Sequence, residues 1–161
     1  MKRVNLILNH PLYAFNLESN ITMEKGWRYC KHDIIHLMDV ARIAYILNLE
    51  NGYGFPKEQV YAAALLHDIT KWKQISEGIP HHESAIEPAT KILKDCGFSS
   101  REIKTITTAI LNHRKGPKDK KDKFSQIIFK ADKLSRTCYF CNYEEKTCNW
   151  DKKKKSTKLE V

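Results

Sequence analysis

Hydrophobic residues recur at helical spacing in several segments of the chain. The clearest segment is 33–50, whose apolar side chains fall at positions 34, 37, 38, 41, 44, 45 and 49, with Asn48 as the polar exception. This spacing is close to the 3.6-residue period of an amphipathic helix. No stretch of useful length alternates apolar and polar residues with the period of two that a strand requires. The pattern therefore predicts an all-α fold.

Proline and capping residues divide the rest of the chain into further helices. Pro11 interrupts one or two helices within residues 4–25. Pro56 stands at the favoured first position of a helix whose alanines and leucines predict burial on most sides. Ser99 or Ser100 caps a later helix. The predicted helices after residue 50 span 56–68, 83–95, 101–113 and 124–136, with polar loops at 72–82 and 115–123.

The length of 161 residues is enough for one domain with a core of its own. We predict a helical domain over residues 1–136, followed by a Cys-containing segment and a Lys-rich tail over 137–161. There is no run of 18 apolar residues and no recognisable signal peptide, so we expect no membrane span and a cytoplasmic location. The sequence does not indicate an oligomeric state.

A net charge of +9 favours anionic partners, namely phosphorylated small molecules, nucleic acid or acidic surfaces. Much of this charge lies in the runs 115–123 and 152–155, which are typical of a solvated loop and a disordered tail. The charge alone therefore does not select a function, although phosphate substrates agree with it. Because no nucleic-acid-binding motif is recognisable, nucleic acid is the least favoured partner.

Four residues with metal-binding side chains fall within predicted buried helices: His36, His67, Asp68 and Asp132. An ionised carboxylate in the apolar stretch around Asp132 costs several kcal/mol unless it is paired or binds metal. Neighbours on a helix point about 100° apart, so His67 and Asp68 can reach one ion only at a helix end or kink. Each residue alone has an ordinary structural explanation, but the set predicts a divalent metal site, with Mn, Fe, Co, Ni, Zn or Mg as the ion.

The order of these motifs resembles that of the HD-domain metal-dependent phosphohydrolases. The motifs lie within residues 30–136 and are HLMDVARIA from residue 36, LLHDITK at 65–71, HHESA at 81–85, AILNHRKG at 109–116 and FKADKLSR at 129–136. The resemblance implies a single compact helical bundle in which His36, His67, Asp68 and Asp132 bind the metal. It also implies hydrolysis of a small phosphoester, such as a nucleotide or a related phosphate, by a metal-activated water.

Two further histidine positions extend this prediction. Some members of the family bind a second metal through two extra histidines, and this chain offers His81 or His82 together with His113. The spacing to the following helix favours His81, with Asp68 bridging the two ions. The alternative is that these histidines contact substrate phosphate or each other, so one or two ions per chain are expected.

Basic residues near these motifs are candidates for phosphate binding. Lys71 matches the family's HD-x-x-K form and is predicted to be catalytic together with Asp68, although Thr70 stands where the family more often has glycine. His32 stands four residues before His36, so it faces the same side of a helix if that helix starts early enough. It is predicted to lie in the second coordination shell, where it orients a ligand or caps the helix. The other phosphate-binding candidates are Arg114, Lys133 and Arg136.

The cysteines offer a separate site. Cys138 and Cys141 form a CxxC half-site, and Cys148 and Cys30 complete four thiols that can hold a structural zinc. A second CxxC is missing, and iron–sulfur ligation, a redox pair and reduced, partly buried thiols remain alternatives. Cys96 is expected in the core.

Three functions follow from these observations. The favoured one is metal-dependent hydrolysis of a small phosphoester. The second is a non-catalytic module that keeps the fold and senses a nucleotide, and the third is a nucleic-acid-binding protein. The complete set of ligand residues favours the enzyme, because a sensor has no need to keep every metal ligand and an open coordination position.

Overall fold

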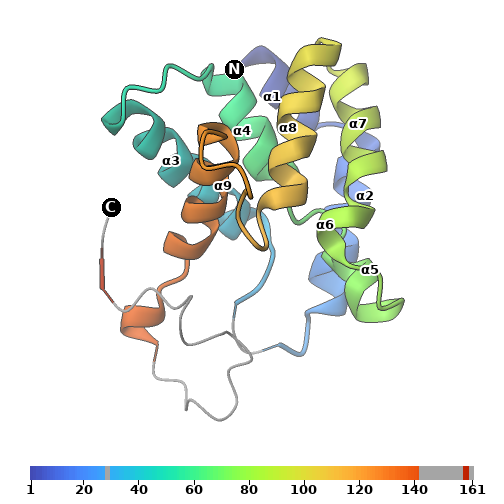
Figure 1. The fold of residues 1–161 in the computed structure, drawn as a ribbon. Coiled ribbons are helices and arrows are strands. Elements are labelled where there is room, and N and C mark those ends of the chain that lie inside the picture. The colour runs from blue at the N-terminus through green and yellow to red at the C-terminus, as the bar shows by residue number, and fades with distance from the viewer. Residues whose placement is uncertain (28–29, 142–157, 160–161) are drawn as a thin grey trace.

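The computed structural model describes residues 1–27, 30–141 and 158–159. All regular elements in these ranges are helices (Figure 1). They are α1 (Lys2–Leu8), α2 (Pro11–Met23), α3 (Ile34–Glu50), α4 (Lys57–Leu66), α5 (Lys71–Ser76), α6 (His81–Ser84), α7 (Ile86–Asp95), α8 (Ser100–Asn112), α9 (Lys123–Leu134) and the 3-10 turn η1 (Cys138–Phe140). The all-α prediction is therefore confirmed. No helix among the described residues is both long and apolar enough to cross a membrane.

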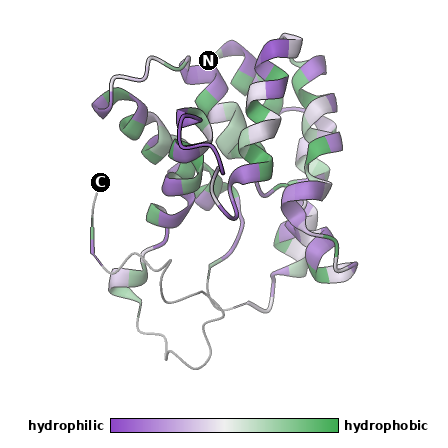
Figure 2. Ribbon diagram, in the orientation of Figure 1, coloured by the Kyte–Doolittle hydropathy of each residue, from purple (hydrophilic) through white to green (hydrophobic). Residues whose placement is uncertain are grey.

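Helix α4 lies at the centre of the bundle. It packs against α3, α8, α1 and α9, and α3 and α8 each also contact α9 (Figure 1). Small side chains let neighbouring helices approach closely, and Ala62, Ala63 and Ala64 are all completely buried. Burial on most sides, which the alanine content predicted, is confirmed. The loop between α8 and α9 lies outside this core and is strongly hydrophilic (Figure 2).

The prediction that residues 72–82 form a loop is wrong. Helix α5 occupies Lys71–Ser76, and α6 begins at His81. Asn20 of α2 accepts a hydrogen bond from the backbone N–H of Trp72 at 2.8 Å, and Asn16 accepts one from the Trp72 indole at 2.9 Å. These contacts come from α2, which is distant in the sequence. The pattern of hydrophobic residues within 72–82 therefore did not predict α5.

Several helix ends also differ from the predicted ones. Pro56 precedes the first residue of α4 as its N-cap, and the helix ends at Leu66, so that Asp68 lies in the turn that follows. The predicted helix 83–95 is divided at Ala85 into α6 and α7. Ser99 caps α8 and forms a capping box with Glu102.

The C-terminal part is described only in places. Helix α9 ends at Leu134, two residues before the predicted domain boundary, and η1 follows within the Cys-containing segment. Cys148 lies outside the described residues. The division of the chain at residue 136 stays a prediction.

Candidate metal centre

Three helices bring four of the predicted ligands together. His36 lies in the first turn of α3, His67 and Asp68 follow α4, and Asp132 lies in the last turn of α9. Asp68 Oδ2 is 3.6 Å from His36 Nε2 and 3.1 Å from His67 Nε2. Asp132 Oδ1 is 3.6 Å and 3.7 Å from the same two nitrogens. All four residues are buried, and we call this group of ligand atoms the first position.

The other carboxylate oxygen of Asp68 belongs to a second group. Oδ1 lies 3.0 Å from His81 Nε2 and 3.3 Å from His113 Nε2, and these two nitrogens are 2.9 Å apart. We call this group the second position. His82 is not part of it, since its Nε2 lies 3.6 Å from Glu83 instead. The structure thus brings together His81, rather than His82, with His113 and Asp68.

The four histidines of these groups share one orientation. Each ring has Nδ1 next to an outer hydrogen-bond acceptor and Nε2 turned towards the aspartates, which is the arrangement typical of metal-ligating histidines. The acceptors are Ser135 Oγ for His36, Ala64 O for His67, Gln74 Oε1 for His81 and Ile110 O for His113. Because Nδ1 carries the proton in each neutral ring, Nε2 presents its lone pair to the centre.

These lone pairs fit a bound cation. The Nε2 atoms of His81 and His113 face each other at 2.9 Å, where two lone pairs repel unless a proton or a metal ion lies between them. His67 Nε2 and Asp68 Oδ1 are buried, and neither makes a hydrogen bond of acceptable geometry within the described residues. Unsatisfied polar atoms of this kind are costly. Nitrogen and carboxylate oxygen ligands suit a divalent transition metal at both positions.

The protonation equilibria of the centre are strongly perturbed. Burial lowers the pKa of His36 to about 3 and that of His81 to about 4. Burial acts in the same direction on His67, but Asp68 and Asp132 outweigh it and raise the pKa of His67 to about 10. Burial disfavours both carboxylates as anions, yet the adjoining imidazoles hold the pKa of Asp68 well below its usual range, as His67 and Lys133 do for Asp132.

We expect the metal-free protein to be most stable near neutral pH. His36 and His81 titrate below the unfolded value of about 6.5, so the unfolded chain binds more protons as the pH falls from there and stability is lost. The raised pKa of His67 has the opposite effect. Its contribution to the stability of the folded state is complete below about pH 6.5 and is lost as the pH rises towards 10. Urea unfolding of chelator-treated protein at a series of pH values measures this. Stability that rises steadily into the alkaline range would contradict it.

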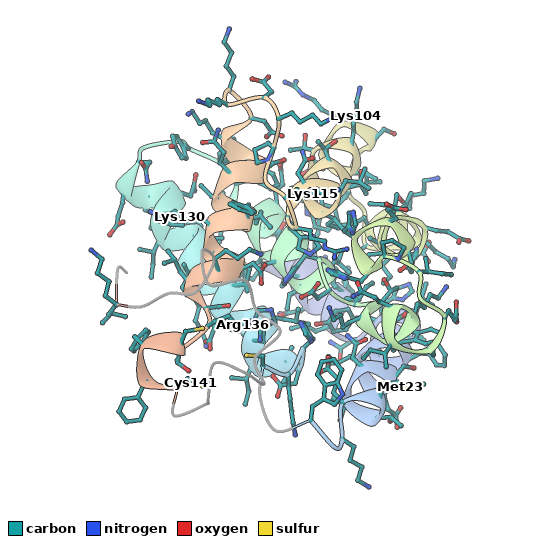
Figure 3. The ribbon with its side chains drawn as sticks, turned by 60° about the horizontal axis from the view of Figure 1, so that its bottom comes forward. Met23, Lys104, Lys115, Lys130, Arg136 and Cys141 are labelled. Atoms are coloured by element: carbon teal, nitrogen blue, oxygen red, sulfur yellow. The ribbon has the colours of Figure 1, made fainter. Side chains whose placement is uncertain are left out.

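The basic residues that the sequence singled out have different surroundings. Lys133 forms an ion pair with Asp132 and also donates to His113 O at 3.4 Å, so it holds a ligand carboxylate. Arg136 donates to His36 Nε2 at 3.1 Å and to Lys31 O at 3.1 Å, between the end of α9 and the start of α3 (Figure 3). A metal ion bound through His36 Nε2 therefore requires the Arg136 guanidinium to move aside.

The two remaining cations lie nearer the second position. Lys71 begins α5 and is close enough to His81 to contribute to lowering its pKa. Arg114 is exposed and contributes in the same direction to the lowered pKa of His82. Contact of Lys71, Arg114, Lys133 or Arg136 with phosphate stays a prediction.

His32 does not lie on the same helix as His36. Helix α3 begins at Ile34 with Asp33 as its N-cap, so His32 belongs to the segment before it. The buried carboxylate of Glu24 binds both its backbone N–H, at 2.7 Å, and its ring Nδ1, at 2.5 Å. His32 still reaches the centre, because its Nε2 lies 3.7 Å from Asp68 Oδ2.

Helix α2 contributes to the centre in a way that the sequence pattern did not predict. Asn20 is fully buried and donates to the backbone carbonyl of Asp68 at 2.9 Å, while it accepts from the N–H of Trp72. Asn16 and Glu24 stand four residues to either side of Asn20 and are also buried. Polar residues at this spacing on a helix lie on one face. The four-residue spacing of these polar residues was the signal available in the sequence. The hydrogen bonds of Asn20 show that α2 holds the turn that carries Asp68.

The cysteines do not add a described metal centre. The groups of three or more potential ligands found within residues 1–27, 30–141 and 158–159 contain only histidine and aspartate. Cys30 and Cys141 are exposed, Cys138 is half-buried, and Cys96 is buried as expected. Since Cys148 lies outside the described residues, the four-thiol zinc site stays a prediction.

Comparisons with known proteins agree with this centre. The family model described as "HD domain" matches residues 33–137, which contain all six ligand residues of the two positions. An uncharacterized protein of Clostridium beijerinckii is 43% identical over 160 residues, which are 99% of each chain. The crystal structure of a predicted HD superfamily hydrolase from an uncultured Thermotogales bacterium is similar with a TM-score of 0.57 and 28% identity, over 75% of this chain and 66% of that one. The chain therefore belongs to the HD-domain family.

Proposed function

We propose that the protein is a metal-dependent phosphohydrolase that cleaves a small phosphoester, with nucleotides and related phosphates as the substrate class. The observation that carries this proposal is the division of the Asp68 carboxylate between two adjacent groups of ligands. In two-metal sites, the two ions together stabilise the attacking and the leaving oxygens of a phosphoryl displacement. A carboxylate placed between the two groups of ligands, as Asp68 is, can hold two ions next to each other. The structural neighbour, a predicted HD superfamily hydrolase, supports hydrolysis as the class of reaction.

The residues of the two positions would bind two metal ions. His36, His67, Asp68 and Asp132 would hold the first ion, and Asp68, His81 and His113 the second. Metal ions at these positions lower the pKa of a bound water and neutralise phosphoryl oxygens. Four ligands at one position and three at the other leave coordination sites open for water and substrate in a six-coordinate ion.

The surrounding cations would bind the substrate. Arg136 lies beside the first position and Lys71 near the second, so each can bind a phosphoryl oxygen once the ions are in place. Lys133 would keep Asp132 Oδ1 turned towards the ion by pairing with its other oxygen. Buried ligands with their outer hydrogen bonds already made need little reorganisation during the reaction, which favours catalysis.

The experiment is a screen of phosphoesters and nucleotides with protein reconstituted separately with Mn, Fe, Co, Ni, Zn or Mg. We expect hydrolysis of at least one small phosphoester, lost in Asp132→Asn. If nucleotides bind without turnover, the sensing module replaces this proposal. Salt-sensitive binding to duplex or single strands, without turnover, would instead favour the nucleic-acid-binding protein.

A further inference from the structure

A buried Glu–His pair lies next to the first position but outside the ligand set. Glu24 is 1% exposed, and both of its carboxylate oxygens bind His32, one at the backbone N–H and the other at ring Nδ1. Burying a carboxylate is costly unless its oxygens are bound, so this pairing fixes the position of the imidazole. Both residues precede the segment 33–137 that the family model matches.

The fixed ring points its second nitrogen at the metal centre. A carboxylate can only accept a hydrogen bond, so the Nδ1 of His32 carries the proton and Nε2 of the neutral ring presents a lone pair. That nitrogen lies 3.7 Å from Asp68 Oδ2, almost as near as His36 Nε2 at 3.6 Å. His32 is nevertheless absent from the group whose ligand atoms all lie within 4.8 Å of one another. It therefore stands beside the first position rather than within it.

Arg136 links the segment that carries His32 to the first position. It donates to the carbonyl of Lys31, the residue before His32, and to Nε2 of the ligand His36. His32 is 7% exposed, close to the 6% of His36 and of Arg136, so it is about as buried as the ligand beside it. A guanidinium and the Nε2 of His32 therefore both lie beside the first position.

We propose that His32, held by Glu24, accepts a hydrogen bond from the group in the open coordination site of the first position. That group is a water before the reaction and a protonated phosphate oxygen after it. The effect on turnover rests on the proposed function, whereas the contact itself does not. His32 would then orient the attacking water and contact the product, and Glu24 would be the positioning residue that keeps Nε2 in place.

Two variants of similar size separate this role from a structural one. Counted in bonds from Cβ, the amide of glutamine ends where Nε2 of histidine lies, and that of asparagine ends where Nδ1 lies. His32→Gln therefore keeps a hydrogen-bonding atom at the active-site end and loses the contact with Glu24. His32→Asn keeps the contact with Glu24 and loses the active-site end. If the pair were only structural, His32→Asn would be the milder change.

The main measurement is the affinity of Co²⁺-loaded protein for inorganic phosphate, followed by the visible spectrum of the ion. We expect His32→Asn to bind phosphate roughly 10-fold more weakly than wild type, with His32→Gln closer to wild type. Metal stoichiometry and the metal affinity should match wild type in both variants. If a phosphoester substrate is found, kcat should fall by roughly 10- to 100-fold in His32→Asn with little change in KM.

Three outcomes overturn the proposal. Weaker Co²⁺ binding with an altered spectrum in both variants would make His32 a metal ligand. Wild-type phosphate affinity in His32→Asn would leave the pair with a structural role, and so would better phosphate binding by His32→Asn than by His32→Gln. Because phosphate binding is measured without turnover, the test stands even if the protein hydrolyses no phosphoester.

Discussion

Asp68→Asn is expected to abolish metal retention at both positions and to reduce kcat by roughly 10³-fold or more, because metal ions supply several kcal/mol of charge stabilisation. The reason is that Asp68 faces His36 and His67 with one oxygen and His81 and His113 with the other. The amide of asparagine is isosteric but carries no negative charge, and only one of its two terminal atoms can bind a metal. Elemental analysis after reconstitution and dialysis measures the loss.

A matched control for this variant is Asp39→Asn. Asp39 is partly exposed on α3, and within the described residues its carboxylate pairs with Arg42, so the same change of charge should leave the metal content unaltered. Circular dichroism should show similar helix content in both variants, since Asp68 lies in a turn after α4. Wild-type metal content in Asp68→Asn would remove Asp68 from the centre.

His113→Ala is expected to lower the metal content from about two ions per chain to about one and to weaken hydrolysis strongly. His113 contributes to the second position alone, where only His81 and Asp68 accompany it. Removing one of three protein ligands leaves too few to retain the ion, whereas the four ligands of the first position remain. Elemental analysis, together with titration of Mn²⁺ into metal-free protein, separates the two sites.

His82→Ala provides the comparison for the metal count. Its ring lies 6.3 Å from that of His113, but its Nε2 faces Glu83, so the variant should keep both ions. A content of one ion in the wild type, unchanged in His113→Ala, would assign His81 and His113 to substrate instead. Loss of an ion in His82→Ala would show that His82, rather than His81, supplies the ligand.

The local sequence pattern was sufficient to predict features that depend on a single helix. The apolar period of residues 33–50 predicted α3 to within one residue, and the two candidate caps, Ser99 and Ser100, placed the start of α8 to within one residue. The adjacency of His67 and Asp68 predicted a helix end, and α4 does end at Leu66. Such features follow from the spacing of side chains around one helix and from hydrogen bonds within a few residues, so they can be inferred without knowing what packs nearby.

How those residues meet depends on the packing of the whole bundle. Trp72 of helix α5 donates hydrogen bonds to Asn16 and Asn20 of α2, and the sequence of residues 71–76 does not predict these contacts. Likewise, Glu24 binds His32 because the end of α2 lies beside the segment before α3. Residue spacing predicted most of the helices and offered the ligands of both positions, with His81 and His82 as alternatives, but it could not show that one oxygen of Asp68 faces each group. That division depends on the packing of α3, α4, α6, α8 and α9, because distances of a few ångströms between side chains far apart in the chain are set by the whole core.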